Sequence, residues 1–188
     1  MKRTVMAAAA AVVLVAVVAV TAPASAATVV QESFENGFGQ WRPDTDGRAP
    51  TATVTISGEQ AFDGAKSVKI FMDGRQDDGT AWIETQLSGP PLARLRVTLS
   101  FQLWSPGQGV AGGWVVVGHA GTADPEAEAD FTRLGYTDVV AGWRPYVRGW
   151  TIRTDRTGKF WVALGTSVVW EVQKFHFMDS VRVDVVPF

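Results

Sequence analysis

The sequence predicts an all-β fold, a sandwich of two antiparallel sheets, on three observations. First, the stretch from Arg94 to Trp104 alternates apolar and polar residues, as a strand with one buried face does. Its apolar face consists of Leu95, Val97, Leu99, Phe101 and Leu103. Second, no segment after the first 26 residues keeps the three-and-four apolar spacing of a capped amphipathic helix. Third, turn sequences such as DTDG, SGPP and DRTG separate the apolar stretches.

The predicted strands follow one another through the rest of the chain. In order they are Thr28 to Phe34, Ala52 to Ser57, Ser67 to Met72, Ala81 to Leu87, Arg94 to Trp104, Gly113 to Gly118, Tyr146 to Thr154, Lys159 to Leu164 and Ser180 to Val186, with weaker strands around Phe131 and Val169. Roughly ten short strands of this kind are typical of a jelly-roll sandwich. The acidic segment from Gly118 to Asp130 is expected to be a long excursion above one sheet, and such loops are often functional.

The beginning of the chain has the three parts of a secretory signal peptide. Lys2 and Arg3 precede an apolar run, and small residues lead up to Ala27. We therefore expect residues 1–26 to be removed and residues 27–188 to form one secreted domain. The alternative is a retained membrane anchor, because an apolar run of about twenty residues can span a bilayer.

Composition narrows the possible partners. The chain has no cysteine, which excludes disulfides, thiolate metal sites and a lipid anchor on cysteine. It has 17 basic and 19 acidic side chains, and loss of Lys2 and Arg3 leaves 15 against 19, so a nucleic-acid partner is not expected. Eight tryptophans and ten phenylalanines exceed the needs of a core this small, and exposed aromatic rings suit the recognition of sugars or proteins. We expect a monomer.

Five segments in order resemble the jelly-roll carbohydrate-binding modules attached to xylanases and glucanases, within the galactose-binding-like superfamily. They are SFENGFGQW at 33–41, FDGAKSVKI at 62–70, AWIETQL at 81–87, GWRPYV at 142–147 and FMDSVRV at 177–183. The resemblance to adhesive MAM-type domains is more distant. The resemblance to the carbohydrate-binding modules implies a sandwich that binds a polysaccharide or a cell-surface glycan without catalysing a reaction.

The same resemblance implies a structural calcium ion that joins the first strand, an early turn and the last strand. The matching positions are Glu35, Asp63, the carbonyl group of Lys66, and Asp179. Calcium takes six to eight oxygen ligands, carbonyl oxygens among them. The alternative is that Asp63 belongs to an ordinary turn and that Asp179 is a solvated charge at the end of a strand.

The family also implies a cleft in which aromatic rings stack on sugar rings. In AWIETQL, Trp82 lies on the face opposite Ile83, and Trp104 lies on the polar face of its own strand. The candidate ligand-binding residues are Trp82, Glu84, Gln102, Trp104 and Arg133. This site requires both indoles to reach one groove from one sheet. The alternative is that the excursion from Gly118 to Asp130 covers them.

The other aromatic and catalytic candidates give weaker signals. We assign Trp41, Trp143 and Trp161 to the core or a strand edge, and leave Trp114, Tyr136 and Trp150 open. No serine accompanies His119 or His176 as a nucleophile, and FHF predicts a strand with an outward imidazole. A glycosidase needs two carboxylates across a cleft, and no sequence feature identifies such a pair. Glu84 with an acidic residue of the segment DPEAEAD is one conceivable pair. We therefore expect a non-enzymatic protein; the alternatives are a cell-surface protein-interaction or structural domain and a small glycan-active hydrolase.

Overall fold

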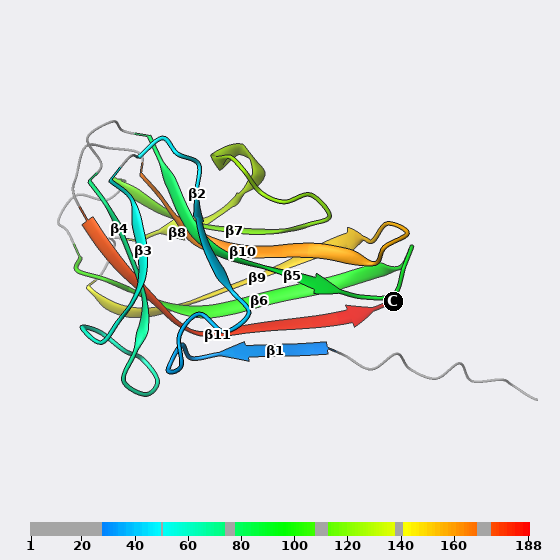
Figure 1. Ribbon diagram of the computed structural model, residues 1–188, viewed down its shortest axis with the longest axis horizontal. Helices are drawn as coiled ribbons and strands as arrows, with labels where there is room; N and C mark the ends of the chain where they lie inside the picture. The colour runs from blue at the N-terminus through cyan, green and yellow to red at the C-terminus, as the bar shows by residue number, and fades with distance from the viewer. Residues whose placement is uncertain (1–27, 50, 74–77, 108–112, 138–140, 169–173) are drawn as a thin grey trace, which may run out of the picture.

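Two antiparallel sheets face each other around one core in the computed structural model, which describes residues 28–49, 51–73, 78–107, 113–137, 141–168 and 174–188 (Figure 1). The strands are β1 (Thr28–Glu32), β2 (Arg42–Thr45), β3 (Thr53–Ser57), β4 (Ser67–Met72), β5 (Thr80–Ser88), β6 (Arg94–Ser105), β7 (Trp114–Gly121), β8 (Thr132–Tyr136), β9 (Gly142–Arg153), β10 (Lys159–Val168) and β11 (Lys174–Pro187). Sheet A has the order β3-β4-β11-β6-β9, and sheet B has the order β2-β5-β10-β7-β8. The predicted all-β sandwich is confirmed.

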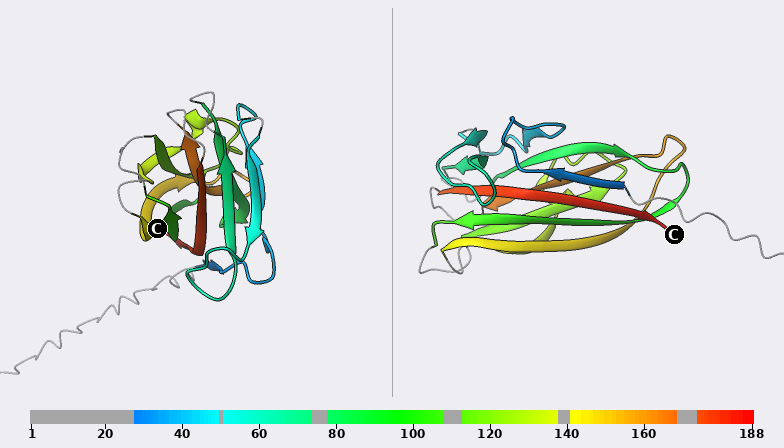
Figure 2. Two further views of the ribbon diagram at one scale, coloured as in Figure 1. Left: turned by 90° about the vertical axis from the view of Figure 1, so that its left-hand side faces the viewer. Right: turned by 90° about the horizontal axis from the view of Figure 1, so that it is seen from below.

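Strand β11 organises sheet A. One side of it pairs with β6, and the other side pairs first with β4 and then with β1. The first and last strands of the described chain are therefore neighbours, as Figure 1 and the right-hand panel of Figure 2 show. A register shift interrupts the β11–β6 pairing between Asp179 and Arg182, where Ser180 has a φ of 50°.

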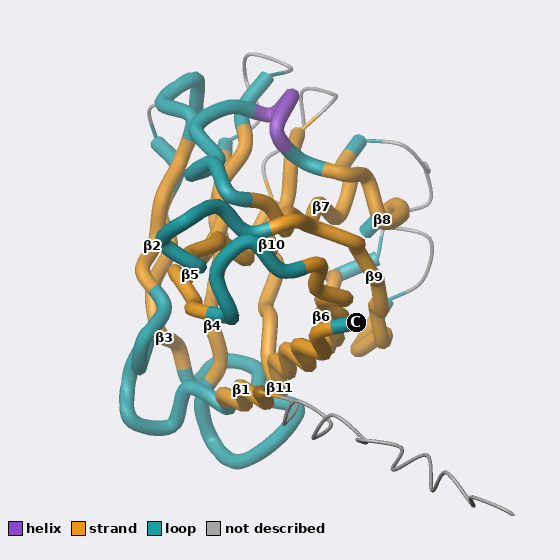
Figure 3. The backbone as a smooth tube through the Cα atoms, turned by 90° about the vertical axis from the view of Figure 1, so that its right-hand side faces the viewer, coloured by secondary structure: helices purple, strands orange, loops and turns teal. Residues whose placement is uncertain are grey.

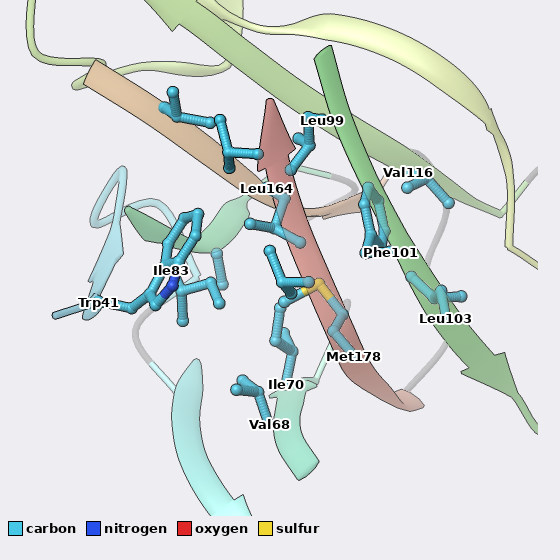
Figure 4. Close-up of a cluster of buried hydrophobic side chains, with 14 of the residues drawn as sticks. Trp41, Val68, Ile70, Ile83, Leu99, Phe101, Leu103, Val116, Leu164 and Met178 are labelled. Carbon is cyan, nitrogen blue, oxygen red and sulfur yellow. The ribbon is translucent and has the colours of Figure 1, made fainter. Parts of the chain in front are cut away.

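The core lies between the sheets and is lined by the alternating faces that the sequence indicates. The predicted row of β6 is buried, since none of its five apolar side chains is more than 2% exposed. Figure 4 shows Leu99 and Phe101 of this row in one cluster with Ile83 and Leu164 of sheet B. Full burial of each such side chain contributes about 1.5–3 kcal/mol, so this packing fixes which face of each strand points inward.

Several boundaries differ from the predictions. Strand β2 was not predicted because its sequence RPDT has no apolar residue and it lies at the edge of sheet B. Strand β11 begins at Lys174 and not near Ser180. The predicted signal peptide and the weak strand at Val169 lie outside the described residues. Within the described residues, no helix is long and apolar enough to span a membrane.

Residues 122–131, which we call the strap, connect β7 to β8 on the outer side of sheet B. The helical turn Glu128–Asp130 lies within the strap and is purple in Figure 3. The ring nitrogens of His119 lie 2.7 Å from the carbonyl oxygen of Asp130 and 3.2 Å from that of Ala123. The Asp130 carboxylate accepts hydrogen bonds from the amides of Glu126 and Ala127. These contacts hold the predicted excursion against the sheet.

Candidate functional site

A hydrogen-bonded network lies on the outer face of sheet B. Glu84, whose side chain is fully buried, accepts hydrogen bonds from Trp82 Nε1 at 2.8 Å and from Arg42 Nε at 2.7 Å. The Arg42 guanidinium also contacts Asp124 of the strap at 2.9 Å. The structure thus brings Glu84 and Asp124, an acidic residue of the segment DPEAEAD, to one arginine. Both carboxylates form ion pairs with Arg42.

Burial raises the pKa of the Glu84 carboxyl, and the hydrogen bonds from Trp82 and Arg42 oppose that rise. The hydrogen bond to Glu84 raises the pKa of the Arg42 guanidinium. Because a carboxylate and a guanidinium form a strong, directional pair, these contacts orient the Arg42 side chain on the sheet.

Trp82 lies beneath the strap and is not exposed. Its accessible surface is 0%, and its ring centroid is 5.0 Å from that of Phe131 at the end of the strap. The prediction that Trp82 stacks on a sugar is therefore wrong for this structure, because the strap occupies the space above the indole.

The predicted groove shared by Trp82 and Trp104 is also absent from the described residues. Trp82 belongs to β5 in sheet B, whereas Trp104 belongs to β6 in sheet A. Their side chains lie on opposite outer faces of the sandwich, because both point away from the core. Gln102 lies on the outer face of sheet A with Trp104, and Glu84 lies on the outer face of sheet B with Trp82.

Arg133, the fifth predicted ligand-binding residue, lies on β8 of sheet B. Its side chain is mostly exposed and contacts Glu128 of the strap at 3.2 Å. It lines a hollow together with Arg48 and Phe131, and it is not a lining residue of the hollow that contains Arg42.

A second hollow on sheet B lies beside Arg42, and it has a volume of about 330 Å³. That lies within the range of about 300–1,000 Å³ for small-ligand sites. Its lining residues are Gln40, Arg42, Glu84, Thr85, Gln86 and Trp161. Trp161 pairs directly with Gln86 across the strands, and the Arg42 guanidinium lies 4.6 Å from the Trp161 ring centroid.

The sequence predicts a structural role for Trp161 in the core or at a strand edge, but the indole is partly exposed in this hollow. The signal that could have placed it is alternation: Phe160 and Val162 are buried in the core, so the residue between them points outward. Arg42 was missed as well, because β2 gives no recognisable strand pattern.

Trp104 belongs to an aromatic group on the outer face of sheet A. It packs against Phe175 and Phe177 of β11, with ring centroids 6.2 and 5.5 Å away. It pairs across strands with Trp143, which contacts Phe62 at 5.7 Å. Trp143 is therefore an outer-face residue, whereas the assignment of Trp41 to the core is confirmed. Among the tryptophans left open, Trp114 is buried in the core and Trp150 packs partly against it.

The four predicted calcium ligands lie around one turn. Glu35 Oε1 accepts hydrogen bonds from the amides of Ala65 and Lys66, and these bonds lower the pKa of the Glu35 carboxyl. Asp179 Oδ2 accepts from the amides of Phe62 and Asp63, while burial raises the pKa of Asp179.

Within the described residues, no three acidic or histidine side chains are grouped to hold a metal. The predicted segments meet in one turn, where backbone amides donate hydrogen bonds to the Glu35 and Asp179 carboxylates. Calcium binding there stays a prediction.

The histidines take structural positions. His176 is fully buried with its ring 5.3 Å from that of Trp114, so the predicted outward imidazole is wrong. It points inward because Phe175 and Phe177 take the outer face of β11. His119 contacts the strap, as described above.

Comparison with known proteins identifies the fold. No family model and no curated protein sequence matches the chain. Among solved structures, the xylan-binding CBM22-1 domain of Paenibacillus barcinonensis Xyn10C aligns with a TM-score of 0.52 at 15% identity, over 87% of this chain and 97% of that domain. The C-terminal family 22 carbohydrate-binding module of Clostridium thermocellum Xyn10B aligns at 0.50 and 16% identity, over 84% and 92%. The chain has the fold of these modules. The resemblance predicted from the five segments is therefore confirmed for the fold.

The same fold occurs in an adhesin. The K3 cleaved adhesin domain of Lys-gingipain from Porphyromonas gingivalis aligns with a TM-score of 0.52 at 15% identity, over 85% of this chain and 99% of that domain. Since one fold supports different functions, the choice between them depends on the site.

Proposed function

We propose that this protein is a secreted, non-catalytic glycan-binding protein and that the hollow at Trp161 on sheet B is its binding site. The observation that carries the proposal is a partly exposed indole with hydrogen-bonding side chains around it, on the fold of carbohydrate-binding modules. A flat aromatic ring covers the apolar C–H face of a sugar, and amide and guanidinium groups hydrogen-bond its hydroxyl groups. Gln40 and Gln86 supply amides, and Arg42 supplies a guanidinium already oriented by Glu84.

The partner we propose is a polysaccharide or a cell-surface glycan, bound by a monomer outside the cell. Xylan is the first polysaccharide to test, because the Paenibacillus domain of the same fold binds it. Sequencing the N-terminus of the secreted protein would check that residues 1–26 are removed.

The test compares retention on insoluble xylan and other polysaccharides for the native protein and Trp161→Ala. We expect the substitution to weaken binding by about 2 kcal/mol, roughly thirtyfold, as removal of an aromatic hot spot does. Circular dichroism should stay unchanged, because the ring lies outside the core. Trp104→Ala, on the opposite sheet, is the matched control and should bind normally. Full retention by Trp161→Ala would refute the site at Trp161, and loss of retention only in Trp104→Ala would move it to sheet A.

A cell-surface protein-interaction domain is the second candidate function. The observation that favours it is the aromatic group on sheet A, where Phe62 is 51% exposed and Phe175 is 37% exposed. Contiguous exposed aromatic surface commonly marks a protein interface. This function predicts that no polysaccharide is retained and that Phe62→Ser with Phe175→Ser abolishes adhesion of the protein to cells.

A further inference from the structure

Three arginines lie together on the outer face of sheet A, away from the hollow at Trp161. Arg94 and Arg96 are on β6, and Arg153 is on β9. Arg94 and Arg153 are direct cross-strand partners, and Arg96 follows on the same face. The right-hand panel of Figure 2 shows β11, β6 and β9 side by side in this sheet.

These arginines have no acidic partner within the described part of the chain. Four other arginines do form ion pairs: Arg42, Arg48, Arg133 and Arg182. Like charges directly opposite each other destabilise a sheet, so the Arg94–Arg153 pair costs stability in the free protein. Binding of an anion would remove that repulsion.

The Phe188 ring contacts two of the guanidinium groups. Its ring centroid lies 5.1 Å from the guanidinium carbon of Arg94 and 5.9 Å from that of Arg96. Cation–π contacts of this kind restrict the freedom of the side chains while leaving their N–H donors available. The donors are therefore partly arranged before a ligand arrives.

A hollow of about 410 Å³ adjoins these charges. It is lined by Arg96, Thr98, Gly149, Trp150 and Thr151. A Cβ atom added to Gly149 would meet no other atom closer than 3.9 Å, so the missing side chain leaves this space open. Two threonines thus lie beside Arg96 in an accessible depression.

The acidic residue on the neighbouring strand, Asp184, already has an arginine partner. Asp184 of β11 pairs with Thr98 across the strands, and Arg182 holds its carboxylate through two hydrogen bonds of 2.8 and 2.6 Å. Three guanidinium groups therefore gather on this face, in a protein that is acidic as a whole.

We propose that this face is a second binding surface, which takes the carboxylate groups of an acidic polysaccharide. A guanidinium donates two parallel hydrogen bonds to a carboxylate, and the threonines and the hollow accommodate the sugar that carries it. The choice of a polysaccharide rests on the proposed glycan-binding function, whereas the preference for an anion rests on the arginines alone. The surface lies on the sheet opposite Trp161, so the two sites can be occupied independently.

The experiment measures binding of the native protein to polygalacturonate and to fully methyl-esterified polygalacturonan, which has the same backbone without the charge. We expect at least tenfold tighter binding to the acid, with the difference shrinking as salt concentration rises. Arg96→Gln and Arg153→Gln should each weaken binding to the acid severalfold and leave binding to the ester unchanged. Retention on xylan through Trp161 should be unaffected, which separates this proposal from the proposed function.

Two controls test whether the surface is more than a positive charge. Arg133→Gln removes an exposed arginine from the other sheet and should change nothing. Gly149→Leu fills the hollow without changing the charge and should weaken binding to polygalacturonate. Equal binding to acid and ester, an equal loss in Arg133→Gln, or equally tight binding to anionic phospholipid vesicles or duplex DNA would overturn the proposal.

Discussion

Trp82 contributes to stability through the contacts that hide it. Its indole nitrogen donates to the buried Glu84, and its ring lies against Phe131 of the strap. Alternation along β5 correctly placed it on the face opposite Ile83. The sequence does not show that a strap more than forty residues later folds back over that face, and therefore exposure could not be predicted.

We expect Trp82→Ala to lower the free energy of unfolding by about 3–5 kcal/mol, because it leaves a cavity and removes a donor from Glu84. Urea denaturation measures the loss. Trp161→Ala serves as the comparison and should cost far less, since its ring is partly exposed. Equal unfolding midpoints for Trp82→Ala and the native protein would contradict the burial of this indole.

At the scale of the element, strand β11 combines an aromatic outer face with a polar inner face near its start. Both ring nitrogens of His176 are buried without a hydrogen-bond partner among the described residues. Burial, with a smaller contribution from the charge of Lys174, lowers the pKa of His176 from 6.5 to about 3. The folded protein therefore holds this imidazole neutral.

This burial predicts acid sensitivity. As the pH falls below about 6.5 the unfolded chain binds a proton at His176, whereas the folded chain does so only near pH 3, so stability is lost through this window. Between pH 7 and 5 the loss from this group is about 2 kcal/mol. His176→Leu should remove that part of the pH dependence in urea melts, and His119→Gln should retain it. An identical pH dependence in His176→Leu would show that other groups cause the acid sensitivity.

For the whole molecule, the segment after β1, an early turn and strand β11 meet at one junction beside sheet A. Glu35 binds the turn that follows Phe62, and Asp179 binds the same turn from β11. Residues distant in sequence are therefore held together by two carboxylates. A cation at this junction would bind carboxylate groups that the backbone amides already orient.

We propose calcium as that cation, and a melting experiment tests it. A ligand that binds only the folded state stabilises it by about 2.7 kcal/mol at one hundred times its dissociation constant. Millimolar calcium should therefore raise the melting temperature relative to EDTA, and Glu35→Gln should reduce the increase. Identical melts in calcium and EDTA would show that the turn is stabilised by its hydrogen bonds alone.

The sequence by itself determined the fold class and the buried face of each strongly alternating strand. The β6 row shows why: reversing it would expose five large apolar side chains, and no other contact compensates for that loss. The resemblance of five segments to carbohydrate-binding modules likewise identified the architecture, since those segments contain its turns and core positions.

Only the tertiary structure decided which outward-facing residues share a surface. Trp82 and Trp104 have the same local pattern, yet strand order puts them in different sheets, on opposite faces. The pairing of β10 with β5 brings Trp161 beside Gln86, and the pairing of β6 with β9 brings Arg94 beside Arg153. Alternation specifies a side of one strand, whereas neighbours across strands depend on sheet order and register, which long-range contacts set.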